Sequence, residues 1–324
     1  MTAKKGMERE SDAGVEAVAR EITVVMPVYN RAAIVGEAVR SIAAQRVRPA
    51  ALLLVDNASI DGTAAVLASL ASELSAPGFE VRVLSEGTPG AAAARNRGLT
   101  EVTTDWVMFF DSDDVMLPGH VESAARAVAG APQADVVGWD VDMEIAPGRL
   151  RRVPFEVRDM QYHNLFHATF ATQRYMARTS LVRRAGGWDP AMLIWDDIEL
   201  GARLLSLAPH VVKVAGDGGA TVVVARHESS ISGLTFASRK EHYAAPLRAM
   251  AATLGERCHH WVALKAMILA ADMAREQSEA GPALRRAILG AVPSWRTRAM
   301  LRFAYSYRRW GGRGVARLLH PFVN

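Results

Sequence analysis

Several residue types are scarce or missing in this chain, and each shortage excludes a class of protein. A single cysteine, Cys258, stands among 324 residues, so an internal disulfide and a thiolate metal cluster are both excluded, and a reducing compartment is expected. The 25 glycines and 14 prolines are too few for a collagen-like or low-complexity chain. No stretch of about 18 uncharged apolar residues occurs, so the sequence predicts no transmembrane helix.

The first 20 residues mix charged and small side chains and lack the apolar segment of a secretory signal. We therefore expect residues 1–20 to form a flexible leader. In the chain as a whole 50% of the residues are hydrophobic, which is enough to bury a sizeable core and excludes global disorder.

Acidic residues are missing after Glu279, whereas nine arginines follow it. The segment 280–324 therefore carries a charge of +9, which leaves −5 for residues 1–279 out of the net +4. A nucleic-acid-binding protein of uniformly basic composition would not have this distribution. We expect no nucleic-acid partner.

From Glu21 onward, short apolar runs alternate with segments of helical spacing, which predicts a mostly parallel sheet flanked by helices. Strands are predicted at Ile22–Val28, Ala51–Val55, Phe79–Leu84 and Trp106–Phe110, with helices at Ile34–Gln45, Asp61–Leu74 and Ala91–Val102. Later we expect strands at Val136–Val141, 172–178, Val211–Val214 and Thr221–Ala225, a hairpin or irregular segment over 142–158, and a helix over Asp196–Leu207. From about Ser238 the pattern is helical, so we predict an α/β domain over 21–235 and a helical, basic extension over 236–324.

An acidic motif, Asp111-Ser-Asp113-Asp114, directly follows the apolar run Trp106–Phe110. In parallel sheets ligands bind beyond the carboxyl ends of the strands, and Mg²⁺ or Mn²⁺ bridges carboxylates to substrate phosphates. Alternation along an extended chain would put Asp111 and Asp113 on one side. An acidic turn that leads into a helix near Pro118 is the alternative interpretation.

Three further segments carry candidate chemistry. Gly90 to Gly98 has neither a dinucleotide nor a P-loop pattern, but Arg95 could meet a diphosphate, unless this is only a tightly packed helix. Asp196 and Asp197 begin an amphipathic helix, where a carboxylate acts either as a helix cap or as a general base. His227 follows an apolar run and is a candidate metal ligand or phosphate contact, although a lone histidine is more often neither.

Together these segments resemble the family 2 nucleotide-sugar glycosyltransferases of the GT-A fold. The resemblance rests on Val25-Met-Pro-Val-Tyr-Asn-Arg31, Leu54-Val-Asp-Asn-Ala-Ser-Ile-Asp-Gly-Thr63, Gly90 to Gly98, Asp111 to Asp114, Gly187-Trp-Asp and Asp196 to Arg203, in the family's order over roughly residues 20–230. It implies a GT-A fold and an inverting transfer of sugar from a nucleoside-diphosphate sugar to an acceptor hydroxyl.

The resemblance also implies a role for each matching residue. Pro27 and Tyr29 would line the nucleoside pocket, and Asp56 or Asn57 would contact the base. The family often has a second aspartate where this chain has Asn57, whose amide can accept from a uracil or thymine N–H but can also donate to another base. UDP and dTDP are the expected nucleotides, and another base stays open.

The diphosphate, metal and acceptor sides follow in the same way. Arg95 would contact the diphosphate, Asp111 and Asp113 would form the metal-binding pair with Mn²⁺ or Mg²⁺, and Asp197 would be the catalytic base. A sugar nucleotidyltransferase is the first alternative, but it would have a glycine-rich basic loop after the first strand. A non-catalytic nucleotide-sugar-binding module is the second.

The acceptor is not identified by any motif; a glycan, a glycolipid or a small molecule would each suit bacterial polysaccharide, lipid-linked glycan or natural-product biosynthesis. Residues 294–317 alternate arginine with aromatic residues. This pattern suits an anionic membrane surface, or equally a solvated helix that packs one side on the catalytic domain. We expect a cytoplasmic enzyme that can work at the inner face of the membrane.

Overall fold

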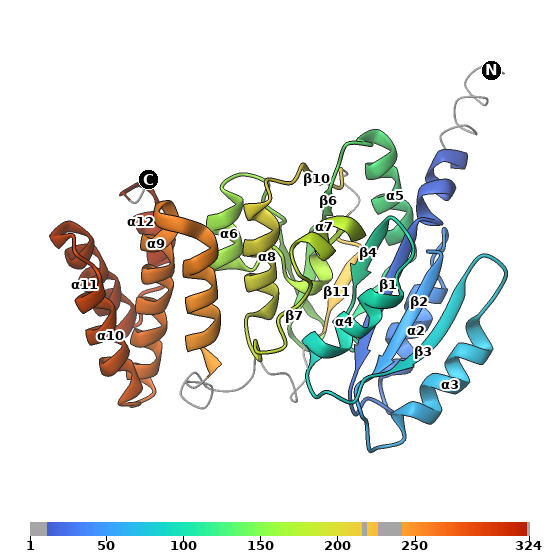
Figure 1. The fold of residues 1–324 in the computed structure, drawn as a ribbon, viewed down its shortest axis with the longest axis horizontal. Helices are drawn as coiled ribbons and strands as arrows, with labels where there is room; N and C mark the ends of the chain where they lie inside the picture. Colours follow the sequence, from blue (N-terminus) through green and yellow to red (C-terminus); the bar gives the residue numbers. More distant parts are fainter. Residues whose placement is uncertain (1–11, 216–218, 226–241, 323–324) are drawn as a thin grey trace. The chain divides into compact units, whose positions relative to one another are not determined.

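The computed structural model describes residues 12–215, 219–225 and 242–322, and it divides into two compact units (Figure 1). We call the described residues 12–158, 170–193 and 207–225 the sheet unit, and residues 159–169, 194–206 and 242–322 the helical unit. The predicted division was a single cut near residue 235. The structure instead assigns two earlier segments to the helical unit, because Leu165 and Ile198 are buried in one cluster with Met267 of the long C-terminal helix.

The sheet unit alternates strands and helices as the sequence predicts. In chain order it contains β1 (Ile22–Val28), α2 (Val35–Ala43), β2 (Ala51–Asp56), α3 (Thr63–Leu74), β3 (Glu80–Ser85), α4 (Ala91–Glu101), β4 (Trp106–Phe109), β5 (Val115–Met116), α5 (His120–Gly130), β6 (Val136–Gly138), β7 (Val141–Ala146), β8 (Arg149–Val153), η1 (Thr172–Arg174), β9 (Tyr175–Arg178), α7 (Thr179–Arg184), β10 (Val211–Lys213) and β11 (Val222–Val224). The first four strands match their predicted bounds within one residue at each end.

The main sheet has the strand order β10-β6-β9-β4-β1-β2-β3, and only β9 runs antiparallel to its neighbours. The predicted α/β class with a mostly parallel sheet is therefore confirmed. Because β1, β2, β3 and β4 are parallel, the loops that follow them emerge at the same edge of the sheet.

Successive residues of β1 face opposite sides of the sheet, as strand geometry requires. Val24 and Met26 belong to one buried cluster with residues of α2 and α3, whereas Val25 faces α4. A Cβ atom added to Gly98 of α4 would lie 2.3 Å from Cγ1 of Val25, so the helix approaches the sheet too closely for any larger residue. This close approach packs α4 directly against β1 and β2.

Two predicted strands begin or end differently in the structure. The single strand expected over 136–141 is interrupted after Gly138, and β7 starts at Val141 and pairs with β8 as the hairpin considered for 142–158. The strand expected over 172–178 begins as the short 3-10 helix η1 and becomes β9 only at Tyr175. A second sheet with the order β5-β11-β7-β8 includes this hairpin.

The leader expected over residues 1–20 lies partly outside the described residues. Residues 12–19 form a helix, and Val15 and Ala19 are buried with the apolar face of the sheet. Apolar side chains four residues apart give this segment one face to bury, so residues 12–19 pack on the core.

The helical unit consists of α6 (Met160–His167), α8 (Asp196–Ser206), α9 (Ala244–Arg275), α10 (Ala280–Ala291), α11 (Trp295–Arg309), α12 (Val315–Leu319) and η4 (His320–Phe322). The helical pattern predicted from about Ser238 is confirmed over the described C-terminal residues. Arg308 of α11 binds the buried carboxylate of Asp272 in α9 through Nε at 2.7 Å and Nη2 at 3.1 Å, which fixes the two helices together. Within the described ranges, no helix has the length and apolar character needed to cross a membrane.

Candidate active site

The loops after β1 and β2 are bound to each other at the carboxyl edge of the main sheet. The Asn30 backbone N–H donates to Oγ of Ser59 at 3.0 Å, and the Ile60 N–H donates to Oδ1 of Asn30 at 2.9 Å. Pro27 is half-buried at the end of β1, whereas the Tyr29 side chain beyond it is 55% exposed. Pro27 and Tyr29, which are predicted to line a nucleoside pocket, therefore lie at the carboxyl edge of the main sheet, where the Tyr29 side chain is accessible to solvent.

Asp56 and Asn57 follow β2 and are both buried. Oδ1 of Asp56 accepts the Ser59 N–H at 3.3 Å, which closes the turn. The Asn57 amide donates to the carbonyl oxygens of Glu86 at 3.0 Å and Thr88 at 2.7 Å, and its Oδ1 accepts from the Gly90 N–H at 2.8 Å.

Asn57 therefore holds the loop between β3 and α4, with its amide group directed at backbone atoms of that loop. An aspartate could accept from Gly90 but could not donate to the two carbonyl oxygens. The same loop restrains Glu86, whose pKa is lowered because its carboxylate accepts the Thr88 N–H.

Arg95 projects from α4 and is buried, and its Nη2 donates to Oδ1 of Asp111 at 2.8 Å. Its guanidinium lies over the ring of Trp188 at 4.3 Å from the centroid, and that ring packs edge-on against Phe109 at 5.1 Å. Gln173 donates from Nε2 to the other carboxylate oxygen of Asp111. The guanidinium is thus held between a carboxylate and an aromatic face at the carboxyl end of β4.

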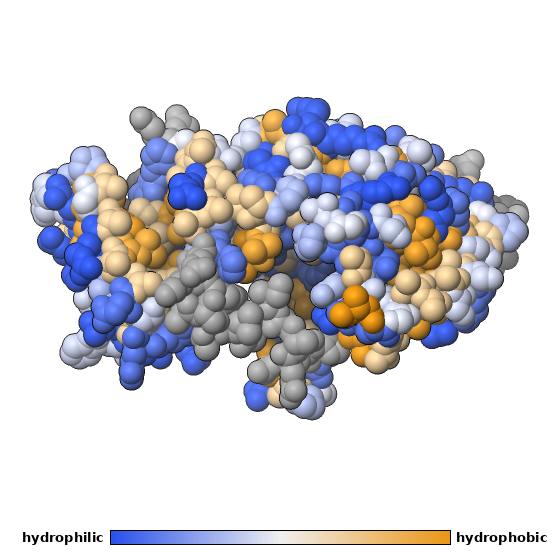
Figure 2. Space-filling model, turned by 60° about the horizontal axis from the view of Figure 1, so that its bottom comes forward, coloured by the Kyte–Doolittle hydropathy of each residue, from blue (hydrophilic) through white to orange (hydrophobic). Residues whose placement is uncertain are grey.

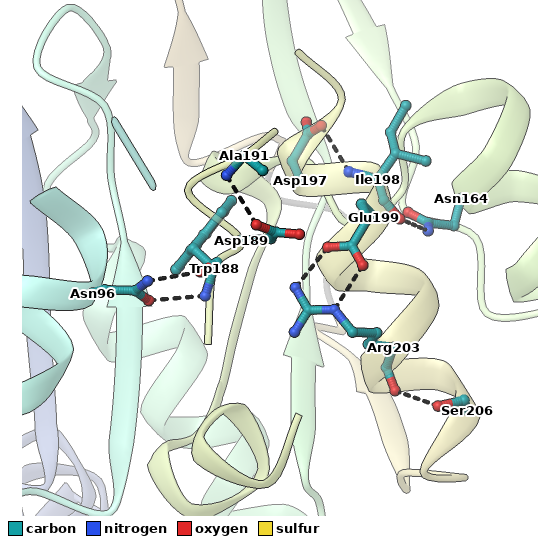
Figure 3. Close-up of polar contacts among 10 residues, drawn as sticks. All are labelled: Asn96, Asn164, Trp188, Asp189, Ala191, Asp197, Ile198, Glu199, Arg203 and Ser206. Carbon is teal, nitrogen blue, oxygen red and sulfur yellow. Dashed lines mark hydrogen bonds and ion pairs between the residues drawn. The ribbon is translucent and has the colours of Figure 1, made fainter. Parts of the chain in front are cut away.

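Trp188 is itself held by α4. Asn96 donates from Nδ2 to the Trp188 carbonyl oxygen at 2.7 Å and accepts the Trp188 N–H at 2.8 Å through Oδ1 (Figure 3). Asp189 accepts the Ala191 N–H at 2.9 Å in the turn that follows. The Gly187-Trp-Asp segment therefore contributes the stacking surface for Arg95.

Asp111 to Asp114 form a turn, and the Asp114 N–H donates to the Asp111 carbonyl oxygen at 3.4 Å. The extended alternation expected for Asp111 and Asp113 is therefore wrong. Their carboxylates meet different cations, since Asp113 pairs with Arg31 of the loop after β1 at 3.7 Å. The side chains of Asp111 and Asp113 remain 27% and 21% exposed, so both are accessible from solvent.

Asp114 has a different environment from Asp111 and Asp113, the other two aspartates of the motif. Its side chain is 1% exposed, and Oδ1 accepts the Ala225 N–H at 2.9 Å. Burial, together with the negative charges of Asp111 and Asp113, raises the pKa of Asp114 well above its usual value. It does not cap the following helix, which begins at His120 after a Gly119 cap without a side-chain bond.

The donor set at this edge suits a hard divalent cation. No group of three or more His, Cys, Asp and Glu side chains with metal-site geometry occurs within the described ranges, and His227 lies outside them. Two accessible carboxylates next to an arginine are nevertheless the kind of incomplete set that Mg²⁺ or Mn²⁺ uses when phosphate oxygens and water supply the remaining ligands.

Asp197 belongs to the helical unit and lies in the first turn of α8. It is half-buried, and its Oδ1 accepts the N–H of the next residue, Ile198, at 2.7 Å (Figure 3). Glu199 is buried and bound by both Nε and Nη2 of Arg203, at 2.7 and 2.6 Å. Glu199 is therefore committed to an ion pair within its own helix, whereas Asp197 keeps a more accessible carboxylate.

Three residues in these contacts were not predicted as site residues. Arg31 and Trp188 lie inside two of the segments that carry the family resemblance, so their position in these motifs was the available signal. Gln173 lies 62 residues from Asp111 and in no motif, and nothing in the sequence pattern pointed to it.

Comparison with known proteins gives a family and a fold. A family model described as Glycosyl transferase family 2 matches residues 23–185, which is half of the chain. The chain is 30% identical over an alignment of 201 residues to the pre-mycofactocin glycosyltransferase of Mycobacterium tuberculosis, and the alignment covers 57% of this chain and 40% of that protein. The matched segments span less than half the length of the first curated relatives.

Among solved structures, residues 1–349 of TarS from S. aureus in complex with UDP-GlcNAc are similar, with a TM-score of 0.62 and 16% identity over 93% of this chain and 92% of that one. The mannosyltransferase PcManGT from Pyrobaculum calidifontis, in complex with GDP-Man and Mn²⁺, has a TM-score of 0.50 and 18% identity over 93% of this chain and 87% of that one. These similarities confirm the predicted GT-A fold.

Proposed function

The chain belongs to glycosyltransferase family 2, and on this premise we propose that it transfers a sugar from a UDP- or dTDP-linked donor to an acceptor hydroxyl with inversion. The observation that carries the proposal is the buried Arg95, paired with Asp111 and stacked on Trp188 at the carboxyl edge of the main sheet. A planar cation held there without freedom to move is suited to a diphosphate. The UDP-GlcNAc complex of TarS supports a nucleotide sugar as the donor.

The nucleoside would lie along the loops after β1 and β2, against Pro27, Tyr29 and Asp56. Asn57 would act on this site through the loop that it holds. A diphosphate that reaches Arg95 would place its negative charge next to Asp111 and Asp113. The departing nucleoside diphosphate would then be stabilised by the fixed guanidinium, which needs no reorganisation during the reaction.

Asp111 and Asp113 would hold Mg²⁺ or Mn²⁺, and the Mn²⁺ complex of PcManGT supports this assignment. When bound, the cation would neutralise charge on the leaving diphosphate. Of the two carboxylates, Asp113 has the more adaptable partner, because its contact with Arg31 is 3.7 Å long while Asp111 is bound by Arg95 at 2.8 Å. His227 remains a candidate further ligand by sequence alone.

Asp197 would accept the proton of the acceptor hydroxyl. The hydroxyl oxygen would attack the anomeric carbon from the side opposite the leaving diphosphate, so that one displacement inverts the configuration. The transition state would resemble the oxocarbenium ion of glycoside hydrolysis.

A donor screen tests the proposal most directly. Purified protein is incubated with UDP- and dTDP-sugars and a panel of hydroxyl acceptors, and released nucleoside diphosphate is measured together with pyrophosphate. Release of nucleoside diphosphate is expected. Release of pyrophosphate would instead indicate a nucleotidyltransferase, and binding of donor without any release would indicate a binding module.

Metal dependence is tested in the same assay. EDTA should abolish nucleoside diphosphate release, and added Mn²⁺ or Mg²⁺ should restore it. Asp113→Ala should weaken the Mn²⁺-dependent binding of UDP about tenfold or more, since one of two carboxylate ligands is lost. Undiminished turnover in EDTA would contradict the metal assignment.

We also propose that the enzyme works in the cytoplasm at the inner face of a membrane, through an outer face of α11. Trp295, Phe303, Tyr307 and Trp310 are 72%, 47%, 37% and 91% exposed, and their spacing places them on one side of the helix. The opposite side of α11 is buried, including Leu301. The exposed side of α11 therefore presents aromatic rings to solvent, while its opposite side packs in the core of the helical unit.

Arginines flank these rings, and the C-terminal segment has no acidic residue after Glu279. Arg296, Arg302 and Arg309 of α11 are exposed. On the face drawn in Figure 2, hydrophobic residues of the helical unit, at the left, lie between hydrophilic ones. Aromatic rings among arginines favour the interface of an anionic bilayer, which would bring the enzyme to a lipid-linked acceptor.

Vesicle binding tests this face. The Trp295→Ser/Trp310→Ser variant should bind phosphatidylglycerol vesicles at least about tenfold more weakly than the parent. The reason is that two large aromatic side chains would no longer be transferred from water into the bilayer interface. Ile60→Ser, at a residue 87% exposed in the sheet unit, is the matched control and should bind normally. Equal binding by all three proteins would contradict the proposal.

A further inference from the structure

Lys265 lies in α9, far along the chain from the acidic motifs, and it connects three segments of the helical unit. Its Nζ donates to the carbonyl oxygen of Leu165 in α6 at 2.5 Å. The same Nζ lies over the ring of Trp195 at 4.0 Å from the centroid. Trp195 directly precedes α8, so one ammonium group joins α6, α9 and the start of the helix that carries Asp197.

The start of α8 is a place where such support matters. Trp195 has a φ of 57°, a left-handed conformation that is unfavourable for a bulky residue. Asn164 of α6 is buried and donates to the Ile198 carbonyl oxygen at 2.8 Å (Figure 3). The first turn of α8 is therefore held by α6 on the backbone and by Lys265 on the Trp195 ring.

The charges around Lys265 couple it to Asp197. Burial of the ammonium group lowers the pKa of Lys265 to about 8, and the negative charge of Asp197 acts in the opposite direction. Because the interaction is mutual, the ammonium equally favours the ionised form of the carboxyl group of Asp197.

Two other buried carboxylates of the helical unit are paired with arginines. Glu199 is paired with Arg203, and Asp272 is bound by Arg308. The remaining titratable side chains of α6 and the first turn of α8 are Tyr162, His163, His167 and Asp196.

We propose that Lys265 is a positioning residue for the transfer reaction, which holds Trp195 and the first turn of α8 in place and keeps Asp197 ionised as the base. The inference rests on the proposed function, in which Asp197 accepts the acceptor proton. It assigns a role in the reaction to a residue of the C-terminal helices, outside the part of the chain that the family model matches.

The pH profile of turnover separates this role from a merely structural one. In Lys265→Met the acidic limb of kcat should shift to higher pH by about one unit, so that turnover below the limb falls about tenfold, while KM for the donor is unchanged. Lys265→Arg keeps the charge and should restore most of the profile. Arg285→Met is the matched control, because Arg285 also lies over an aromatic ring, Tyr305 at 4.8 Å, in the same unit.

A second measurement does not depend on activity. Unfolding of the parent, Lys265→Met, Asp197→Asn and the double variant is followed in denaturant, and the four stabilities form a cycle. Lys265→Met should destabilise the parent more than it destabilises Asp197→Asn, because the charge pair is already lost in the latter.

The outcomes distinguish the two proposals. Equal destabilisation in both backgrounds, or an unchanged pH profile in Lys265→Met, would overturn the role of Lys265 while leaving the transferase proposal intact. Full turnover by Asp197→Asn would instead remove the base on which the inference rests, whatever the cycle gives.

Discussion

The sheet unit and the helical unit place different cations near the carboxylates that we propose to act in the reaction. In the sheet unit Asp111 is bound by Arg95 at 2.8 Å, and Asp113 pairs with Arg31 at 3.7 Å. In the helical unit the negative charge of Asp197 acts on Lys265, whose pKa burial lowers to about 8. A guanidinium stays protonated at any pH a protein meets, whereas a lysine with this pKa can lose its proton.

The difference suits the two proposed tasks, diphosphate and cation binding in the sheet unit and proton transfer in the helical unit. A diphosphate and a cation need a constant charge environment, which arginine provides. A general base must exchange a proton in every turnover. Its pKa, which depends on the charges around it, therefore has to lie near the working pH. The predictions that follow test whether the two units depend on charge in these separate ways.

The largest expected effect is on the base. Asp197→Asn should lower nucleoside diphosphate release by a factor of about 10²–10⁴, because an amide cannot accept the proton. UDP binding, measured calorimetrically with Mn²⁺, should stay within about twofold, since the residues proposed to bind the nucleotide are in the sheet unit. Asp196→Asn changes the neighbouring carboxylate and serves as the control; a similar loss there would mean that the first turn of α8 is sensitive to any change.

Arg95→Met tests the fixed cation of the sheet unit. We expect KM for the donor to rise about 10–100-fold, the range of one or two charge-assisted hydrogen bonds, and the unfolding temperature to fall because Asp111 loses its partner. Arg97→Met, on the same helix and paired with the partly exposed Glu101, is the matched control. If the two variants behaved alike in donor kinetics, Arg95 would have no special role in binding the diphosphate.

The free energy of unfolding should depend on pH in the acidic range through the sheet unit and in the alkaline range through the helical unit. Burial lowers the pKa of His120 in the sheet unit to about 3 from 6.5, so the unfolded chain binds more protons between these values and the free energy of unfolding falls on acidification. For Lys265, lowered to about 8 from 10.5, the same rule makes the free energy of unfolding rise with pH between those values.

Denaturant unfolding at a series of pH values checks both slopes. His120→Asn should remove an acidic loss of about 2–4 kcal/mol and leave the alkaline slope unchanged. Lys265→Met should remove the alkaline slope and leave the acidic one. Loss of both slopes in either variant would show that the two groups do not act independently.

The smallest effects concern glycines at close contacts. A Cβ atom on Gly281 of α10 would lie 2.5 Å from the Ala270 carbonyl oxygen, whereas on Gly98 it would meet a side-chain methyl of Val25. Both alanine variants should lose about 1–3 kcal/mol of stability, the usual cost of overpacking, and Gly281→Ala should lose more because backbone must move. Gly130→Ala, with nothing within 4 Å, is the control for thermal melting.

Much of the sheet unit could be predicted from local sequence. The run Ile22–Val28 is a strand with the predicted bounds, because seven consecutive apolar or β-branched residues can be buried on both faces of a parallel sheet. The positions of Asp111, Asp113 and Arg95 at the carboxyl edge follow from the strands before them. Periodicity and the order of elements were sufficient for these residues.

Contacts between distant residues could not be predicted in this way. The sequence indicated Asn57 as a base contact, but its amide binds the backbone of Glu86, Thr88 and Gly90, which only the folded loop brings within reach. The acidic motif was expected to be extended, and a turn directs its carboxylates to Arg95 and Arg31 instead.

The sequence by itself determined the alternation of strands and helices, the family motifs and the accumulation of positive charge after Glu279, because each depends on neighbouring residues or on composition. Only the tertiary structure decided that Gln173 would bind Asp111 across 62 positions and that Lys265 would bind Leu165 across 100. The physical reason is that a hydrogen bond depends on distance in space, and no local pattern specifies which distant side chain the fold delivers to a buried carbonyl or carboxylate.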